Sequence, residues 1–495
     1  MKWLRALLVL AGASLVAQAQ TNTTVRELSL RDCIELALKH NLDLQIDRYG
    51  PKVALYTWRA AYGAYDPSLS LSGQHSHSET GPQVLGGGFV IPPSQTDDNS
   101  FSGSLGSISP IGTTYSLQGN ATDTYGANSG APFENSIASA SFTLSQPLLK
   151  NFWIDSSRLT IRVAKNRLKY SELLLKLQIM QTLTTLEQAY YDLIYNRTNL
   201  VVQQEAVLLA ERLVSENKTK LQIGTLAPLD LQSAEAQAAS SRAAVFAAQS
   251  QLGTQERVVK QLITEQFAPW SSIELVPLDN LGAVPRNLNL QDSWSLGLTR
   301  RPELLQAKLD VERQGIQLKY DKNQLFPELD VFGTYGYNGS GKEFSDALYN
   351  VQQVGQRFYT YGARLTVPLA RTTVRNTYNA DRATMQQLVL TLKKLEQAIM
   401  IAIDNDIGNL RANLDQVRAT RAAREYEEAA LDAEQKKLDN GKSTTYTVLQ
   451  VQRDLTTARG NEIQALDNYN KSLAQLSLDE GTTLDRLNID FQVAK

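Results

Sequence analysis

The chain has 495 residues, a formal net charge of −2, 20% charged residues and a single cysteine. This charge balance gives no basis for nucleic-acid binding or for a polybasic membrane-binding patch, and one cysteine cannot form a disulfide framework. The sequence contains no glycine-rich phosphate loop and no nucleophile elbow, so neither an enzyme nor a bound cofactor is expected.

Residues 1–19 have the pattern of a cleaved export signal. A basic start precedes an apolar run that ends at Val16, and Ala-Gln-Ala at 17–19 is a typical cleavage site. The run is too short to span a bilayer, and no later stretch approaches the roughly 18 apolar residues that a spanning helix needs. Cys33 lies beyond the cleavage site, so a lipoprotein anchor is not expected.

The remaining sequence consists of two related halves, residues 20–288 and 289–495. Leu-Ser-Leu-Arg-Asp at 28–32 returns as Leu-Asn-Leu-Gln-Asp at 288–292. A repeat of this size is far longer than the roughly 20–50 residues of solenoid repeats. The halves therefore predict one architecture with internal structural duplication. Further matched positions are Pro67 and Pro327, Pro147 and Pro368, and Gly224 and Gly441.

The first half begins with a helical pattern and continues into strands. Leu69 and Leu71 alternate with serines, as in a strand with one apolar face. The loop from Gly81 to Asn99 is rich in turn residues and is predicted to be exposed. Whether residues 79–125 add strands or form extracellular structure stays open. The expected elements are a helix at 29–63, a strand region at 66–147, a long helix at 154–222, a return helix at 228–266 and an equatorial segment at 267–288.

The second half repeats this order, and its strands show the clearer pattern. Apolar and aromatic residues alternate with polar ones, and Arg364 lies on the polar side, as in a strand between lipid and water. The residues expected to face lipid are Tyr335, Tyr337, Tyr359, Tyr361 and Leu365, with Arg364 facing the lumen. The expected elements are a helix at 290–326, a strand region at 328–368, a long helix at 372–440, a return helix at 445–479 and a tail at 480–495.

Both long helices carry heptad repeats. Apolar residues recur at every seventh position from Leu186 to Leu221, and again from Ile403 to Leu438 with Arg424 as the one charged interruption. Such repeats predict helices that supercoil around neighbours. At about 1.5 Å per residue, each helix would approach 100 Å in length, which a compact globular domain does not require.

The three histidines do not point to a metal site. His75 and His77 share one face of a strand, but neither a cysteine nor a cluster of carboxylates stands beside them in the sequence. Exposed strand or loop histidines are the favoured interpretation, and no metal is expected.

The order and spacing of these features resemble TolC-like outer-membrane factors, the outer membrane efflux protein family, over residues 28–480. The resemblance rests on the paired motifs near Leu30 and Leu290, on the prolines where the chain enters and leaves its strand regions (Pro67, Pro147, Pro327 and Pro368), and on the helix-turn glycines Gly224 and Gly441. It implies a mixed α and β membrane protein. Three chains would share a long α-helical coiled-coil barrel in the periplasm and a transmembrane β-barrel, with four strands from each chain.

The resemblance also implies a function. Such homotrimers are passive exit ducts in the outer membrane, working with a periplasmic adaptor and an inner-membrane RND or ABC pump in efflux or type I secretion. One alternative stays open, a secreted or surface trimeric coiled-coil protein with a structural or adhesive role, whose strands would form a soluble head.

The periplasmic aperture departs from the family pattern. The family carries acidic rings just after the two glycine turns, and Asp230 retains one of these acids. Thr447 and Gln450 stand at positions that are usually acidic, and Asp454 lies one helical turn further on. A second interpretation of Asp230, as a helix-start acid stabilised by the helix dipole, stays open.

Overall fold

The computed structural model describes residues 24–490 except 85, 89, 129 and 225. The expected export signal at 1–19 and the last residues of the tail lie outside this range. The chain divides into two units, and both long helices contribute to each of them. Within the described residues, the helical unit comprises 24–46, 179–294 and 402–490, and the sheet unit comprises 47–178 and 295–401.

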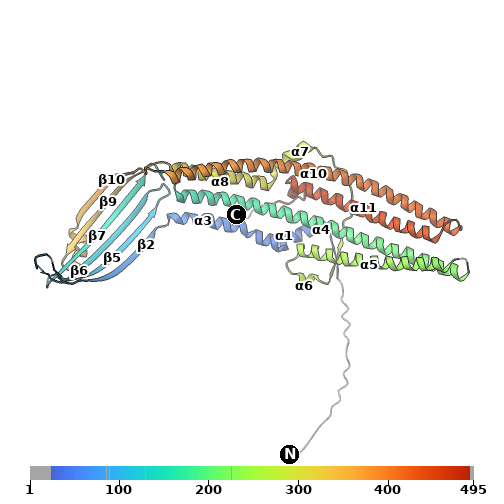
Figure 1. Ribbon diagram of the computed structural model, residues 1–495, viewed down its shortest axis with the longest axis horizontal. Helices are drawn as coiled ribbons and strands as arrows, with labels where there is room; N and C mark the ends of the chain where they lie inside the picture. The colour runs from blue at the N-terminus through green and yellow to red at the C-terminus, as the bar shows by residue number, and fades with distance from the viewer. Residues whose placement is uncertain (1–23, 85, 89, 129, 225, 491–495) are drawn as a thin grey trace, which may run out of the picture. The chain divides into compact units, whose positions relative to one another are not determined.

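An antiparallel sheet of six strands dominates the sheet unit, in the order β10-β9-β7-β6-β5-β2 (Figure 1). Consecutive strands pair over long stretches, so that β2 meets β5 from Ser68 opposite Gly106 to Thr80 opposite Ser94. The sheet ends at two outer strands, β10 and β2. The strands are β2 (Ser68–Thr80), β5 (Ser94–Ile108), β6 (Thr114–Asn128), β7 (Ala131–Pro147), β9 (Glu328–Gly341) and β10 (Gln356–Thr366).

The expectation of four strands per chain is wrong. Strands β5 and β6 lie between β2 and β7 in the same sheet, so the additional residues of the first half add strands. The physical reason is continuous pairing: the alternation of β2 and β7 continues through the hairpin, which satisfies its backbone groups on both sides. The exposed loop is also shorter than expected, because β5 begins at Ser94. Two exposed short strands, β3 (Gln83–Val84) and β4 (Val90–Ile91), pair within it.

The helices expected at 29–63 and 290–326 are interrupted. Asn41 adopts an extended backbone conformation, and its side chain accepts the Leu44 N–H at 3.0 Å, which ends one helix and begins the next. Pro302 occupies the first turn of α8, where its missing N–H costs nothing and the preceding residue is forced out of the helix. The resulting pieces are α1 (Leu30–His40), α2 (Leu42–Asp47), α3 (Tyr49–Ala60) and the 3-10 turn η1 (Ala61–Tyr65), and α7 (Leu290–Arg300) and α8 (Pro302–Gln324).

The long helices run without interruption as α4 (Ser156–Gln222) and α10 (Thr372–Asp439). Their return helices are α5 (Pro228–Ile263) and α11 (Thr445–Asp479). In the helical unit the heptad residues are buried or half-buried: Leu186 and Ile403, for example, have no exposed surface, whereas Val207 is half-buried. Among the described residues, no helix has an apolar stretch long enough to cross a membrane.

Short elements complete the helical unit. A two-stranded parallel sheet joins the N-terminal β1 (Thr24–Leu28) to β8 (Ile273–Pro277) from the expected equatorial segment. Tyr190 of α4 is buried beside them, and its hydroxyl lies within hydrogen-bond distance of two acceptors, the Leu28 carbonyl at 3.0 Å and the Asp279 carboxylate at 2.8 Å. The remaining elements there are α6 (Phe267–Trp270) and α12 (Thr483–Arg486).

Candidate conducting faces and helix-tip aperture

One face of the sheet is apolar across all six strands. The pairing register places Leu71 beside Gly103, Phe101 beside Ala121, and Phe142 beside Tyr335. Directly paired residues in antiparallel strands share a face, so the apolar surface is continuous. The residues on it are Leu69, Leu71 and Gly73 on β2; Phe101, Gly103 and Leu105 on β5; Leu117, Gly119 and Ala121 on β6; Ala138, Ala140, Phe142 and Leu144 on β7; Val331, Gly333, Tyr335 and Tyr337 on β9; and Tyr359, Tyr361, Ala363 and Leu365 on β10.

The five residues expected to face lipid all lie on this face and are exposed. Tyr361 is 81% exposed and Leu365 is 61% exposed, unusual values for large apolar side chains. The tyrosines contact each other: the hydroxyls of Tyr335 and Tyr337 lie 3.1 Å apart, and the rings of Tyr359 and Tyr361 are stacked. A contiguous exposed apolar patch of this kind marks a binding or membrane-contacting surface.

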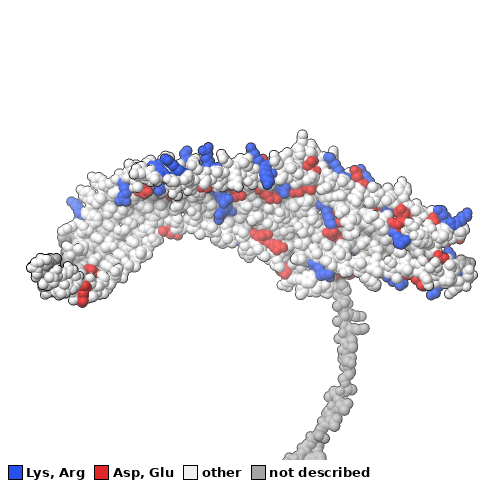
Figure 2. All heavy atoms as spheres, viewed as in Figure 1, with Lys and Arg blue, Asp and Glu red and all other residues white. Residues whose placement is uncertain are grey.

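The opposite face of the sheet is polar. Arg364 lies on it, with its guanidinium 5.5 Å from the centre of the Phe332 ring. Small hydroxyl side chains pair across the strands, as between Ser72 and Ser102 at 2.6 Å and between Thr143 and Thr334 at 3.0 Å. Figure 2 shows few charged side chains over the visible middle of the sheet. The hydroxyl pairs make the face that holds Arg364 polar and hydrogen-bonding.

The four prolines lie at strand ends. Pro67 and Pro327 directly precede β2 and β9, Pro147 is the last residue of β7, and Pro368 follows the end of β10. Proline donates no backbone hydrogen bond, so it fits where the ladder begins or stops. The chain passes at these points between the sheet and the helices of the same unit. The Lys150 N–H, for example, reaches the Pro327 carbonyl at 3.3 Å.

Gly224 and Gly441 both adopt the left-handed conformation that ends a helix, with φ of 79° and 69°. After α10, the Gly441 N–H donates to the Leu438 carbonyl at 3.0 Å and the Lys442 N–H to the Lys437 carbonyl at 2.8 Å. These two bonds form a Schellman motif. Both glycines thus stop a long helix and allow the chain to turn back, because other residues rarely adopt this conformation.

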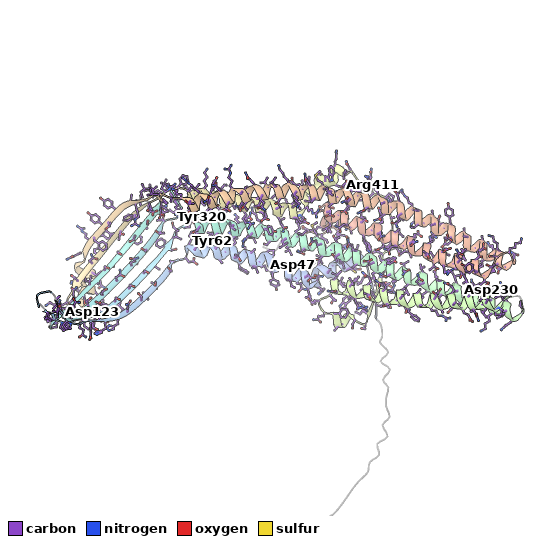
Figure 3. All side chains as sticks on the ribbon, viewed as in Figure 1. Asp47, Tyr62, Asp123, Asp230, Tyr320 and Arg411 are labelled. Carbon is purple, nitrogen blue, oxygen red and sulfur yellow. The ribbon has the colours of Figure 1, made fainter. Side chains whose placement is uncertain are left out.

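The expected aperture residues lie just after these turns. Asp230 is half-buried in the first turn of α5 (Figure 3), and its N–H donates to the Ala227 carbonyl at 3.1 Å. Thr447 donates its N–H to the Thr444 hydroxyl, the N-cap of α11, at 3.3 Å. Gln450 and Asp454 are exposed on the same helix. Within the described part of the chain, no hydrogen bond or ion pair joins Asp230 to the α11 residues.

A charge cluster that was not predicted from the sequence surrounds one heptad position of α10. Arg424, the interruption in the α10 heptads, lies against Glu462 of α11 at 2.5 Å and Glu428 at 2.8 Å. Arg459 of α11 also binds Glu428, and it binds Glu205 of α4 at 2.7 Å. This charge cluster, completed by Arg421, ties α10, α11 and α4 together within the helical unit. Its only signal in the sequence was a charged residue at a heptad position.

Two buried ion pairs in the helical unit were not predicted at all. Glu187 has no exposed surface and binds Arg486 of α12; burial raises the pKa of its carboxyl, while Arg486 opposes the shift. Asp467 is equally buried and binds Lys471 at 2.7 Å. Burial raises the pKa of Asp467 to about 6, and the bond from Lys471 opposes this. The Glu187–Arg486 pair joins α12 to α4, and the Asp467–Lys471 pair lies within α11.

Two of the histidines, His75 and His77 of β2, each hydrogen-bond to a side chain of β5. His75 lies 2.9 Å from the Asn99 side chain, and His77 lies 2.6 Å from Asp97. Over the residues that the structure describes, no group of three or more metal-binding side chains is arranged to hold a metal ion.

Comparison with known proteins finds similarity to outer membrane efflux proteins. Residues 295–479 match the family model described as outer membrane efflux protein. Outer membrane protein TolC of Vibrio cholerae serotype O1 is 23% identical over 375 residues, which cover 74% of this chain and 82% of that protein.

Solved structures show the same fold. The Campylobacter jejuni CmeC outer membrane channel superposes with a TM-score of 0.68 at 15% identity, covering 92% of this chain and 86% of that one. The outer membrane protein VceC of Vibrio cholerae superposes with a TM-score of 0.67 at 16% identity, covering 91% and 96%. The second half of the chain thus matches the outer membrane efflux protein family, and nearly its whole length resembles the TolC-like outer membrane channels in fold.

Proposed function

We propose that the protein is an outer-membrane exit duct, assembled as a homotrimer, for a tripartite efflux or type I secretion system. The duct conducts substrates passively from a periplasmic adaptor and an inner-membrane RND or ABC pump to the outside. The helical tunnel lies in the periplasm, and residues 1–19 direct export before they are removed.

The two-faced sheet carries this proposal. Its apolar face is exposed on every strand, while its opposite face is lined by small polar side chains and Arg364. Strands that separate lipid from water have this alternation. An open sheet edge is not tolerated in lipid, because its backbone groups find no partners there. The outer strands β2 and β10 are therefore paired with those of neighbouring copies, which closes a barrel.

Six strands from each of three chains would make a wide barrel. Barrels of roughly 16–18 strands leave an aqueous channel, whereas eight strands leave only a packed interior. The polar face then lines the channel. The turns at Gly224 and Gly441 lie at the periplasmic mouth, where Asp230, Thr447, Gln450 and Asp454 border the aperture and an adaptor docks.

Fractionation and conductance test the proposal together. The full chain should sediment with outer membranes and migrate faster in gels when unheated, and the purified protein should form ion-conducting pores in planar bilayers. A control chain with Tyr361→Arg and Tyr359→Arg, which charges the exposed apolar face, should fail to insert. A soluble trimer that is secreted and forms no pores would favour a structural or adhesive rod instead.

A further inference from the structure

The connection between β9 and β10 does not extend away from the sheet but folds over its apolar face. It forms the helical turn α9 (Phe344–Tyr349) and the π-helical turn η2 (Asn350–Val354). Ala347 is 1% exposed and packs with Ala121 and Ala138 of the sheet. The Phe344 ring contacts the Phe101 ring edge to face, with centroids 5.6 Å apart.

The position of this segment is fixed by glycines of β9. A Cβ at Gly339 would lie 2.3 Å from the Ala347 carbonyl oxygen, and one at Gly341 would lie 2.4 Å from Asp346. Any side chain at these positions would push the segment off the strand. Asn350 adds a hydrogen bond from its side chain to the Ser340 carbonyl at 2.8 Å. The segment is therefore built to lie close against the sheet.

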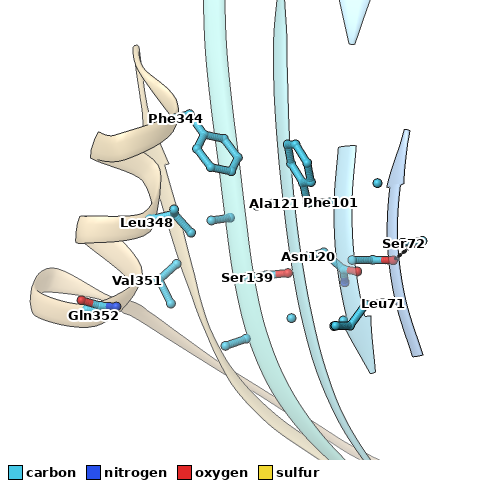
Figure 4. A pocket seen from close by; sticks show the side chains of 16 residues that line it. Leu71, Ser72, Phe101, Asn120, Ala121, Ser139, Phe344, Leu348, Val351 and Gln352 are labelled. Carbon is cyan, nitrogen blue, oxygen red and sulfur yellow. Dashed lines mark hydrogen bonds between the residues drawn. The ribbon is translucent and has the colours of Figure 1, made fainter. Parts of the chain in front are cut away.

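The segment does not fill the face that it covers. A groove of about 690 Å³ remains between it and strands β2, β5, β6 and β7 (Figure 4). This volume lies within the range of about 300–1,000 Å³ of ligand pockets. Its floor consists of small residues that include Gly103, Gly119 and Ala140, and its walls are apolar side chains from both sides, among them Leu71, Phe101 and Leu348.

At Gly119 the floor has room for added atoms. A Cβ at Gly119 would meet its nearest neighbour, the Ser139 carbonyl oxygen, only at 3.9 Å. Leu71 is 75% exposed and Leu348 is 41% exposed, so the groove is open along its length. At Ala140, which pairs with Tyr337 of β9, the groove adjoins the part of the apolar face where the exposed tyrosines lie. An occupant that enters from the surroundings of that face must be apolar and slender.

We propose that this groove binds an alkyl chain of an outer-membrane lipid. The inference rests on the proposed function, because it requires the apolar face to contact the bilayer. A hydrocarbon chain matches the apolar walls, the narrow small-residue floor and the continuity with the lipid-contacting surface. The bound chain would replace the missing side chains beneath α9 and hold the β9–β10 connection on the barrel.

Photolabelling of the intact protein tests the groove. The full chain is reconstituted in phosphatidylethanolamine and phosphatidylglycerol vesicles that contain a trace of phosphatidylcholine with a diazirine on its acyl chain. After irradiation and trypsin digestion, label is measured on two adjacent peptides. Peptide Glu343–Arg357 contains the groove wall, and peptide Phe358–Arg364 contains the exposed Tyr359 and Tyr361 outside the groove and serves as the internal reference.

Both peptides of the wild-type protein should carry label. Ala140→Leu fills the floor and should lower the label on Glu343–Arg357 about fivefold relative to the reference, which corresponds to roughly 1 kcal/mol of lost apolar contact. Leu71→Gln should lower it in the same direction. Leu69→Gln, on the same face and strand but outside the groove, is the matched control and should leave the ratio unchanged.

The outcomes separate the two proposals. A labelled reference peptide with a ratio unchanged in both groove variants would overturn the alkyl-chain site and leave the duct intact. Label on the reference peptide alone would mean that protein side chains close the groove, which also overturns the site. Absence of label from both peptides would overturn the lipid-facing assignment of the sheet and the groove with it.

Discussion

Neighbouring residues of one strand are expected to respond in opposite ways to the same substitution. Tyr361 lies on the apolar face near the middle of β10, and Thr360 lies on the polar face that already holds Arg364. A charge on the lipid face near mid-membrane costs about 2–4 kcal/mol. Tyr361→Arg should therefore reduce the heat-modifiable form in outer-membrane fractions, and Thr360→Arg should not. Equal tolerance of both would mean that the faces are assigned to the wrong sides.

Asp230 offers a residue-level test of the aperture. If three copies line the periplasmic mouth, they produce a modest preference for cations, and salt screens it because the Debye length is about 10 Å at 0.1 M. Asp230→Asn should reduce cation selectivity in planar bilayers at low salt, and Asp454→Asn provides the comparison from α11. If selectivity at low salt is untouched, Asp230 acts only as a helix-start acid favoured by the dipole.

Asp321 predicts a pH dependence of stability. It is 4% exposed in α8, and burial together with a hydrogen bond to Asp381 raises the pKa of its carboxyl to about 6. The folded state then holds a proton that the unfolded chain has already lost above about pH 4. This group's contribution to stability is therefore present below about pH 4 and lost as the pH rises through about 6.

Replacing the Asp321 carboxyl with a group that does not titrate should remove this loss of stability at high pH. Asp321→Asn should raise the free energy of unfolding at about pH 8 by on the order of 1–3 kcal/mol, with little effect at about pH 4. Thermal unfolding of the detergent-solubilised protein at both pH values measures this. Asp310→Asn, on the same helix, is the control. A gain for Asp321→Asn that is the same at both pH values would contradict the shifted titration.

At the scale of elements, the sequence predicted correctly those helices and turns that depend on interactions between residues close together in the chain. The heptads indicated the uninterrupted helices α4 and α10, because an apolar seam and the absence of proline act within a few turns. The interruption at Asn41 depends on one side-chain hydrogen bond, and the interruption at Pro302 depends on a single proline. Neither changes the helical pattern of the residues around it, so both were missed. The turns at Gly224 and Gly441 were predictable from the sequence, because glycine is the residue that most readily adopts the left-handed conformation that ends a helix.

The heptad interruption at Arg424 gives the prediction at this scale. Arg424→Leu would complete the apolar seam, yet it should destabilise the protein by about 1–3 kcal/mol, because the largely buried Glu462 loses its nearest partner. Combining Arg424→Leu with Glu462→Leu should restore most of the stability, as replacing both members of a buried pair often does. Thermal unfolding of the single and double variants measures this. A stabilised single variant would show that the charge cluster contributes nothing.

At the scale of the whole molecule, the number of strands was beyond reach of the sequence alone. Whether residues 79–125 add strands stayed open in the sequence, because β5 meets β2 and β6 only through long-range pairing. The folding of α9 over the sheet has the same origin. It depends on Gly339 and Gly341, which leave space for the helical turn. The need for that space is visible only in the folded structure, where the turn lies against them.

The sheet edges lead to the last prediction, which concerns assembly. Among the described residues, strands β2 and β10 each pair on one side only, and the apolar face beside them is exposed. In lipid or detergent these edges need partners, and six strands are too few to enclose a water-filled channel. Native mass spectrometry in mild detergent should therefore give a trimer. A monomer that keeps its full strand content by circular dichroism would contradict the shared barrel, and a pore formed by such a monomer would contradict the duct as proposed.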